Sequence, residues 1–120
     1  MINRSLLIVR AKEPFLEWIK SLPDPADVSM EKVDRDNTAC LLPEYSYDYE
    51  EEKLIEQFYD LIFEEQLSGW WTEKNDWPAK RELAMFKKWF DVEFHSAVLD
   101  LVDAPLRGAM GGAMGTGLEI

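Results

Sequence analysis

Cysteine and histidine, which hold many of the metals found in proteins, are almost absent from this sequence. Cys40 is the only cysteine among 120 residues, and His95 is the only histidine. A single cysteine cannot form an intrachain disulfide, and it excludes a cysteine-based zinc or iron–sulfur cluster within one chain. The sequence therefore fits a reducing compartment, and it predicts no metal site and no cofactor.

Long hydrophobic runs are also missing. The longest apolar stretches, such as Ser5–Val9 and Ser96–Leu99, are far shorter than the roughly 20 residues that a membrane-spanning helix needs. The first of them is interrupted at Arg10 and Lys12, so it does not have the pattern of a secretory signal. We therefore expect a cytoplasmic protein without a membrane partner.

Positive charge is scarce as well. The 13 lysine and arginine residues face 24 aspartate and glutamate residues, which gives a formal net charge of −11. Such a field repels nucleic-acid phosphates and anionic lipids, and it favours basic partners. The glycine-rich stretch 108–117 precedes no helix, and no Gly-x-Ser-x-Gly or kinase signature is present. The sequence thus predicts no direct nucleic-acid binding and no phosphate-binding loop.

The remaining composition is typical of one globular domain. Apolar residues make up 47% of the chain, which is enough for one core at this length. We place the domain at residues 1–105. Residues 106–120 form a Gly/Ala/Met-rich tail, in which Gly-Ala-Met-Gly occurs twice, and we expect this tail to be flexible and without functional weight.

Hydrophobic periodicity predicts three strands and three helices. Strands are expected at 4–10, 38–42 and 92–102, helices at 14–22, 48–69 and 80–90, and a loop at 23–36 that allows one turn of helix after Ser29. The fold class is therefore α/β (α+β), with two layers in β-α-β-α-α-β order. We expect a small three-stranded mixed sheet with helices mainly on one face. Its first strand should be central and buried on both faces, and parallel to the second if the two are neighbours.

The helix at 48–69 carries the least expected feature of the sequence, a ridge of acidic residues. Asp48 and Glu51 have the spacing of a capping box, and Gly69 is a natural stop. Four carboxylates follow at intervals of four residues, opposite the apolar stripe, and we call them the acidic ridge: Glu52, Glu56, Asp60 and Glu64. Nine acidic residues between positions 44 and 65 face one base, Lys53.

This ridge has two interpretations. It is either a solvated helix face that keeps the protein soluble, or a docking surface for a basic protein partner, with mimicry of DNA phosphates as a special case. A tryptophan-rich connector follows the helix, and it either folds over the core or exposes a patch for a partner or a second copy. We therefore add Trp70 and Trp71 to the predicted partner-binding residues.

His95 provides the alternative hypothesis, a small enzyme or a metal-dependent module. Glu93 lies two residues earlier and shares its side of a strand, so the two side chains are neighbours. Two ligands do not make a metal site, and no nucleophile accompanies them. Cys40 lies in a short apolar strand and is expected in the core.

Several segments together resemble a family of small, uncharacterised bacterial proteins. The segments that carry the resemblance are Asn3–Arg10, Pro14–Trp18, Ser21–Asp24, Leu42–Tyr45, Met85–Ser96 and Leu99–Leu101. The resemblance covers nearly all of the chain up to Pro105 and excludes the tail. It implies no activity and transfers no site residue. The hypothesis for function is therefore a non-enzymatic interaction protein with an acidic helix.

Overall fold

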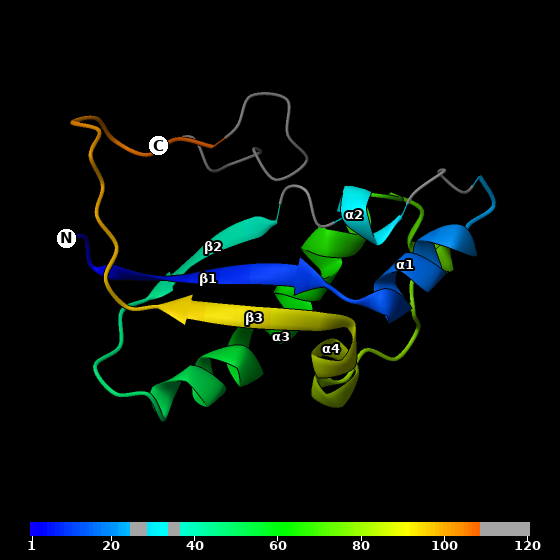
Figure 1. Ribbon diagram of the computed structural model, residues 1–120, viewed down its shortest axis with the longest axis horizontal. Helices are drawn as coiled ribbons and strands as arrows, with labels where there is room; N and C mark the ends of the chain where they lie inside the picture. Colours follow the sequence, from blue (N-terminus) through cyan, green and yellow to red (C-terminus); the bar gives the residue numbers. More distant parts are fainter. Residues whose placement is uncertain (25–28, 34–36, 109–120) are drawn as a thin grey trace.

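The chain forms a three-stranded sheet with helices packed along one side of it (Figure 1). This computed structural model describes residues 1–24, 29–33 and 37–108. Its elements are β1 (Arg4–Ala11), α1 (Glu13–Lys20), α2 (Met30–Val33), β2 (Thr38–Pro43), α3 (Glu50–Ser68), the 3-10 turn η1 (Lys74–Asp76), α4 (Leu83–Trp89) and β3 (Phe90–His95). The predicted fold class and element order are confirmed, and α2 is the turn of helix allowed after Ser29. The predicted tail lies mostly outside the described residues.

The sheet has the order β2-β1-β3, so the prediction that the first strand is central is confirmed. The predicted parallel pairing is wrong, because β1 runs antiparallel to both neighbours. Val9, near the end of β1, pairs with Thr38, the first residue of β2. The connection through α1 therefore returns the chain beside the end of β1, and β2 runs back along it.

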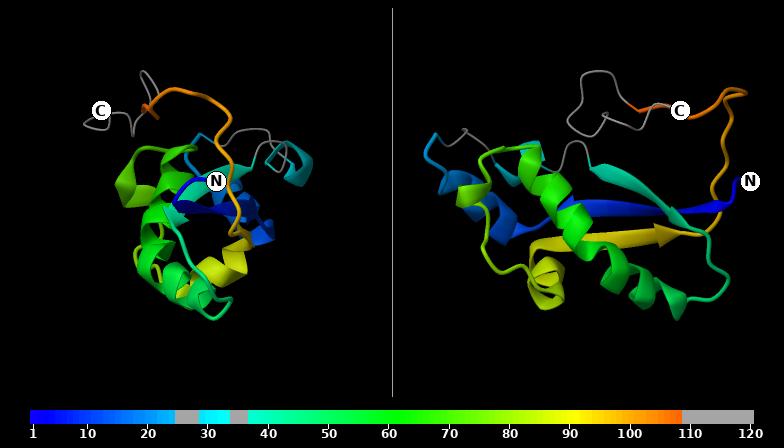
Figure 2. Two further views of the ribbon diagram at one scale, coloured as in Figure 1. Left: turned by 90° about the vertical axis from the view of Figure 1, so that its left-hand side faces the viewer. Right: turned by 180° about the vertical axis from the view of Figure 1, so that it is seen from behind.

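Only one face of the sheet is fully covered. Along β1, Ser5, Leu7 and Val9 are buried, while the alternate residues Leu6 and Ile8 are half-buried. The right-hand view of Figure 2 shows α3 crossing the buried face. The prediction that β1 is buried on both faces is therefore wrong. We call the other side, which faces the reader in Figure 1, the open face.

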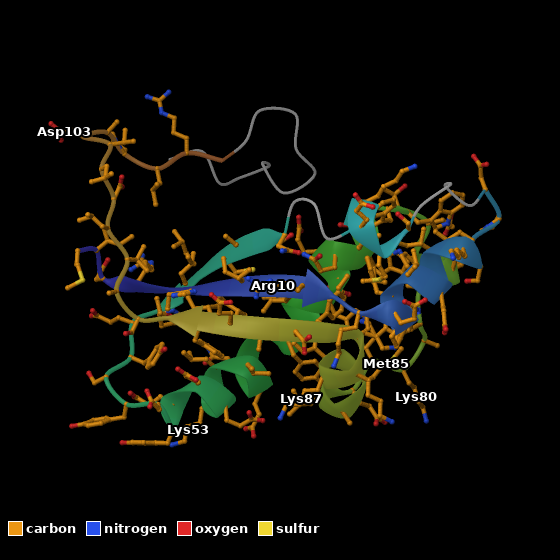
Figure 3. All side chains as sticks on the ribbon, in the orientation of Figure 1. Arg10, Lys53, Lys80, Met85, Lys87 and Asp103 are labelled. Carbon is orange, nitrogen blue, oxygen red and sulfur yellow. The ribbon has the colours of Figure 1, made fainter. Side chains whose placement is uncertain are left out.

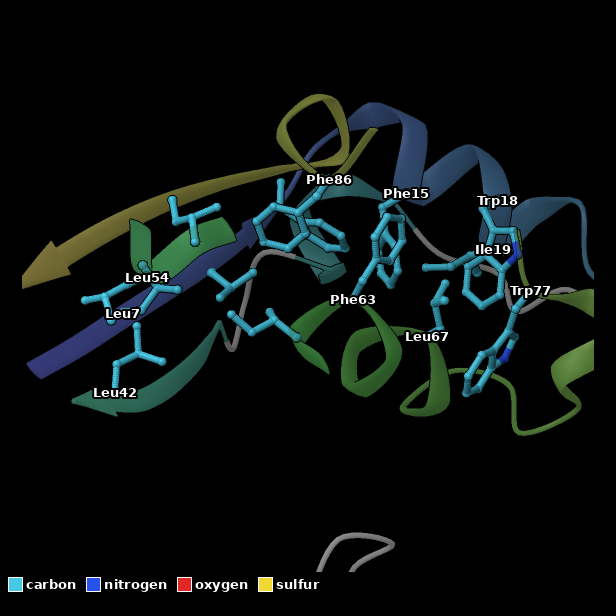
Figure 4. Packing of buried hydrophobic residues seen from close by; sticks show 14 of the residues in the cluster. Leu7, Phe15, Trp18, Ile19, Leu42, Leu54, Phe63, Leu67, Trp77 and Phe86 are labelled. Atoms are coloured by element: carbon cyan, nitrogen blue, oxygen red, sulfur yellow. The ribbon is translucent and has the colours of Figure 1, made fainter. Parts of the chain in front are cut away.

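Aromatic rings fill the space between the sheet and the helices (Figure 4). Phe63 of α3 packs against Phe86 of α4 and Phe90 of β3, with ring centroids 6.0 and 5.4 Å away. Phe15 of α1 completes this group through Phe90, at 5.1 Å. Trp18, on the inner face of α1, is buried as well. No helix in the described part of the chain is both long and apolar enough to cross a membrane.

The last strand is shorter than expected, because β3 ends at His95 and not at Val102. His95 pairs with Leu6, and β1 begins only two residues earlier, at Arg4. Beyond this pair the Ile2 N–H still donates to the Val98 carbonyl oxygen at 2.9 Å, but the regular ladder with β1 has ended. Leu99 and Leu101 lie exposed on the segment that follows His95.

Candidate functional site on helix α3

The start of α3 is held by carboxylates, but not in the predicted way. Tyr49 is the N-cap residue, and its side chain makes no capping hydrogen bond. The predicted capping box of Asp48 and Glu51 is therefore wrong. The Glu50 carboxylate instead accepts hydrogen bonds from the backbone N–H groups of Tyr47 and Ser46, at 2.9 and 2.8 Å. These two bonds are the main reason that the pKa of Glu50 is lowered.

The second carboxylate of α3 anchors the preceding loop. The hydroxyl of Tyr45 donates to Glu51 Oε2 at 2.7 Å, and the Tyr45 ring packs edge-on against Phe94. Desolvation, this hydrogen bond and the charges of Glu51 and Asp48 together raise the pKa of Tyr45 to about 12. The loop before α3 is therefore tied to both the helix and the sheet.

Three of the four ridge carboxylates are paired with bases that follow α3 in the sequence. Glu52 pairs with Lys87 of α4, which is labelled in Figure 3. Arg81 bridges two ridge residues, with Nε 2.8 Å from Asp60 Oδ1 and Nη2 2.7 Å from Glu64 Oε2. The basic residues of the segment 80–88 were a signal in the sequence that this pairing was available. The like-charge repulsion along the ridge is thereby relieved.

Arg81 is the central member of this ionic network. Its side chain is only 16% exposed, its guanidinium lies 5.9 Å from the centre of the Trp77 ring, and Nη1 donates to the carbonyl oxygen of Pro78. Such a fork binds two carboxylates in a fixed geometry. Asp60 and Glu64 thus fasten α3 to the segment leading into α4, and Glu56 is the ridge residue without an ion pair in the described structure.

An exposed pair of tyrosines lies immediately before α3, where the sequence predicted no site. Tyr47 and Tyr49 are 61% and 66% exposed, and their rings stack with centroids 5.4 Å apart and planes inclined by 18°. Lys53, one turn further along and labelled in Figure 3, places its ammonium group 5.9 Å from the Tyr49 ring centre. The recurrence of tyrosine at positions 45, 47 and 49 was the available signal.

Three carboxylates in the loop before α3 and in its first turns have no ion pair within the described residues. Asp48 lies between the two tyrosines in the chain, and Glu56 lies on α3 about two helical turns, or about 10 Å, beyond Tyr49. Glu44, in the same loop, is also exposed. We call this set the tyrosine–acid surface: Glu44, Tyr47, Asp48, Tyr49 and Glu56.

The predicted tryptophans lie at the other end of α3, about 28 Å away along a helix of 19 residues. Trp71 is half-buried and donates through Nε1 to Asp76 Oδ2 at 2.8 Å, while its carbonyl accepts from Trp77 Nε1. Trp70 is 37% exposed and lines a pocket of about 310 Å³. The connector thus mainly folds back over the core, and Trp70 is its exposed member.

The alternative pair, His95 and Glu93, lies on the open face of the sheet and not in the core. Glu93 Oε1 accepts from Arg10 at 2.8 Å, while its other oxygen contacts His95. The hydrogen bond from Arg10, more than that from His95, lowers the pKa of Glu93. Neither of the two pockets described is lined by His95 or Glu93. Among the described residues, no group of three or more histidine, cysteine, aspartate or glutamate side chains could hold a metal ion.

Comparisons of the chain with protein-family models, with curated proteins and with solved structures found no match. The resemblance to a family of small bacterial proteins therefore stays a prediction.

Proposed function

We propose that this chain is a cytoplasmic, non-enzymatic interaction protein that binds a basic protein partner through the tyrosine–acid surface. The observation that carries the proposal is the exposed, stacked pair Tyr47–Tyr49 beside unpaired carboxylates. Stacked rings of this size exposed to water are a typical anchor of an interface, since tyrosine buries a large area at a small cost in side-chain entropy.

The chemistry of this surface suits lysine and arginine side chains. An aromatic face attracts a cation within about 6 Å of its centre, and a neighbouring carboxylate adds a charge-assisted hydrogen bond. Lys53 already occupies such a position over the Tyr49 ring. A partner's basic side chains would find the same combination at Tyr47 with Asp48 and Glu44.

The charge of the whole molecule supports the same class of partner. A net charge of −11, with nine of the acidic residues between positions 44 and 65, attracts a basic surface over a distance and raises the rate of encounter. Glu52, Asp60 and Glu64 are already paired with basic residues of this chain. We therefore propose that they hold α3 in place and add to the negative electrostatic field around it. The direct contacts with the partner are made by the tyrosine–acid surface.

The proposal is tested by capture of partners from a lysate at low and at high salt. Beside the native protein we would run the double variant Tyr47→Ala, Tyr49→Ala and the single variant Glu56→Lys. Glu17→Lys on α1 is the matched control, because Glu17 is exposed and forms no side-chain bond in the described structure. A partner held by the native and control proteins, lost from the other two and released by salt is the expected result. Equal retention by all four proteins would refute the proposal.

A further inference from the structure

The two edge strands of the sheet differ sharply in charge. Both β2 and β3 have a neighbour on one side only among the described residues. Strand β3 carries Asp91, Glu93 and His95, and charges of this kind protect an edge from pairing with another chain. Strand β2, with the sequence Thr-Ala-Cys-Leu-Leu-Pro, has no charged residue at all.

The unprotected edge also exposes apolar side chains. Leu41 is 44% exposed, and Ala39 on the same side of β2 is exposed as well. In the register of the sheet these two residues pair with Leu6 and Ile8 of β1, so all four share the open face. In Figure 1, β2 is the outermost strand of the sheet, and the described segment that follows β3, drawn in orange, rises past its end and runs above it in this view.

We propose that the chain forms a homodimer through β2, in which the β2 strands of two copies pair antiparallel and join two sheets into one of six strands. An exposed edge of unpaired backbone groups is a template for strand addition. Antiparallel pairing of a strand with its own copy is compatible with a two-fold axis, so each copy uses the same surface. The dimer does not depend on the proposed function.

The distribution of charge points to a second copy as the occupant. Two molecules with a net charge of −11 repel each other, and the repulsion is strongest where their α3 helices face. The β2 edge is uncharged, and the flanking charged residues of β1 on the open face are Arg4 and Arg10. A strand of another protein that carries charged residues would place some of these charges beside the apolar side chain of Leu41. A second copy of β2 has no charged residue and would place only uncharged side chains there.

The size of the contact sets the expected affinity. Pro43 cannot donate to a ladder, so pairing extends over the five residues before it. Such an interface falls below about 1,200 Å² of buried surface, the range of weak and transient complexes. We therefore expect a dissociation constant in the micromolar range or weaker, and a dimer that forms with rising concentration.

Sedimentation equilibrium over a series of concentrations tests the dimer. We expect the native protein to shift from monomer to dimer and Leu41→Lys to stay monomeric, because a charge on the edge opposes pairing. Leu61→Lys on α3 is the matched control, since Leu61 is also a leucine exposed to solvent, at 60%, and should still dimerise. Circular dichroism checks that each variant is folded. A native protein that stays monomeric, or a dimer retained in folded Leu41→Lys, overturns the proposal.

Hydrogen exchange identifies the interface. At a dimer-forming concentration, amide protection should increase in residues 38–42 of the native protein and of Leu61→Lys, but not of Leu41→Lys. Protection that increases instead in the segment 99–106 or in α3 would place another surface in the contact and would refute pairing through β2.

Discussion

Arg81 shows how one side chain decides the role of several others. Asp60 and Glu64 look like free docking groups in the sequence, yet the guanidinium of Arg81 holds both and packs over Trp77. Lys87 makes a similar contact with Glu52, but from a side chain that is 48% exposed. Ion pairs exposed to water contribute little to stability, whereas a desolvated fork with several partners contributes more.

Replacing Arg81 should therefore cost more than replacing Lys87. We expect Arg81→Ala to lower the free energy of unfolding by about 1–2 kcal/mol, and Lys87→Ala by less than about 0.5 kcal/mol. Urea unfolding of both variants and the native protein measures the difference. Equal effects would mean that the burial of Arg81 adds nothing to its ion pairs.

Tyr45 should ionise only in strongly alkaline solution. Its pKa is raised from 10.0 to about 12, so folding favours the neutral phenol. The associated stability is fully present below about pH 10 and is lost as the pH rises toward about 12. Removing the charge with Glu51→Gln should lower this pKa, which ultraviolet titration of the phenolate measures. An unchanged titration curve would contradict the assigned role of Glu51.

At the scale of elements, the first turn of α3 responds to acid through Glu50. Its pKa is lowered from 4.5 because the carboxylate accepts two backbone hydrogen bonds. The stability that this gives is present above about pH 4.5 and is lost as the pH falls through the lowered value. Glu50→Gln cannot titrate, so its thermal midpoint should fall less than that of the native protein between about pH 5 and pH 3.

The matched control for this acid response is Glu17→Gln on α1, which removes a carboxylate that forms no side-chain bond in the described structure. It should follow the native protein over the same pH range. If Glu50→Gln lost stability in acid as steeply as this control, the cap formed by Glu50 would not contribute to the helix start.

Helices and strands with a strong hydrophobic periodicity could be predicted from the sequence. The direction in which strands pair and the point at which a strand ends were harder to predict. The apolar stripe that includes Leu54 and Phe63 placed α3 to within two residues at its start. Strand direction was missed because it depends on the path of the whole connection between β1 and β2 and not on the strands themselves. The end of β3 was missed because apolar residues continue beyond His95 in the sequence, although the ladder with β1 stops at the pair Leu6–His95.

For the molecule as a whole, stability depends on the aromatic core between α1, α3 and α4. Phe63 is completely buried at its centre, while Leu61, two residues earlier on the same helix, is 60% exposed. We expect Phe63→Ala to lower the free energy of unfolding by about 3–5 kcal/mol, and Leu61→Ala to change it by no more than about 0.5 kcal/mol. Chemical denaturation compares the two, and a small loss for Phe63→Ala would contradict the described core.

The candidate site was only partly predictable at this scale. The excess of acidic residues in α3 is a property of the sequence, and so is the net charge on which the proposal of a basic partner rests. Which carboxylates stay unpaired is a property of the fold, because Arg81 and Lys87 approach from a later segment. The stacking of Tyr47 on Tyr49 likewise depends on how the loop before α3 is held by Glu50.

The central claim, that the tyrosine–acid surface binds basic protein, is tested most directly by calorimetric titration with a lysine-rich peptide as the probe. The native protein and Glu17→Lys should bind it with similar affinity, and the affinity should fall as salt screens the charges. The double variant Tyr47→Ala, Tyr49→Ala should bind at least tenfold more weakly, a loss of about 1.4 kcal/mol. Equal binding by the double variant, or stronger loss in Glu17→Lys, would show that only the overall charge acts and would contradict the account.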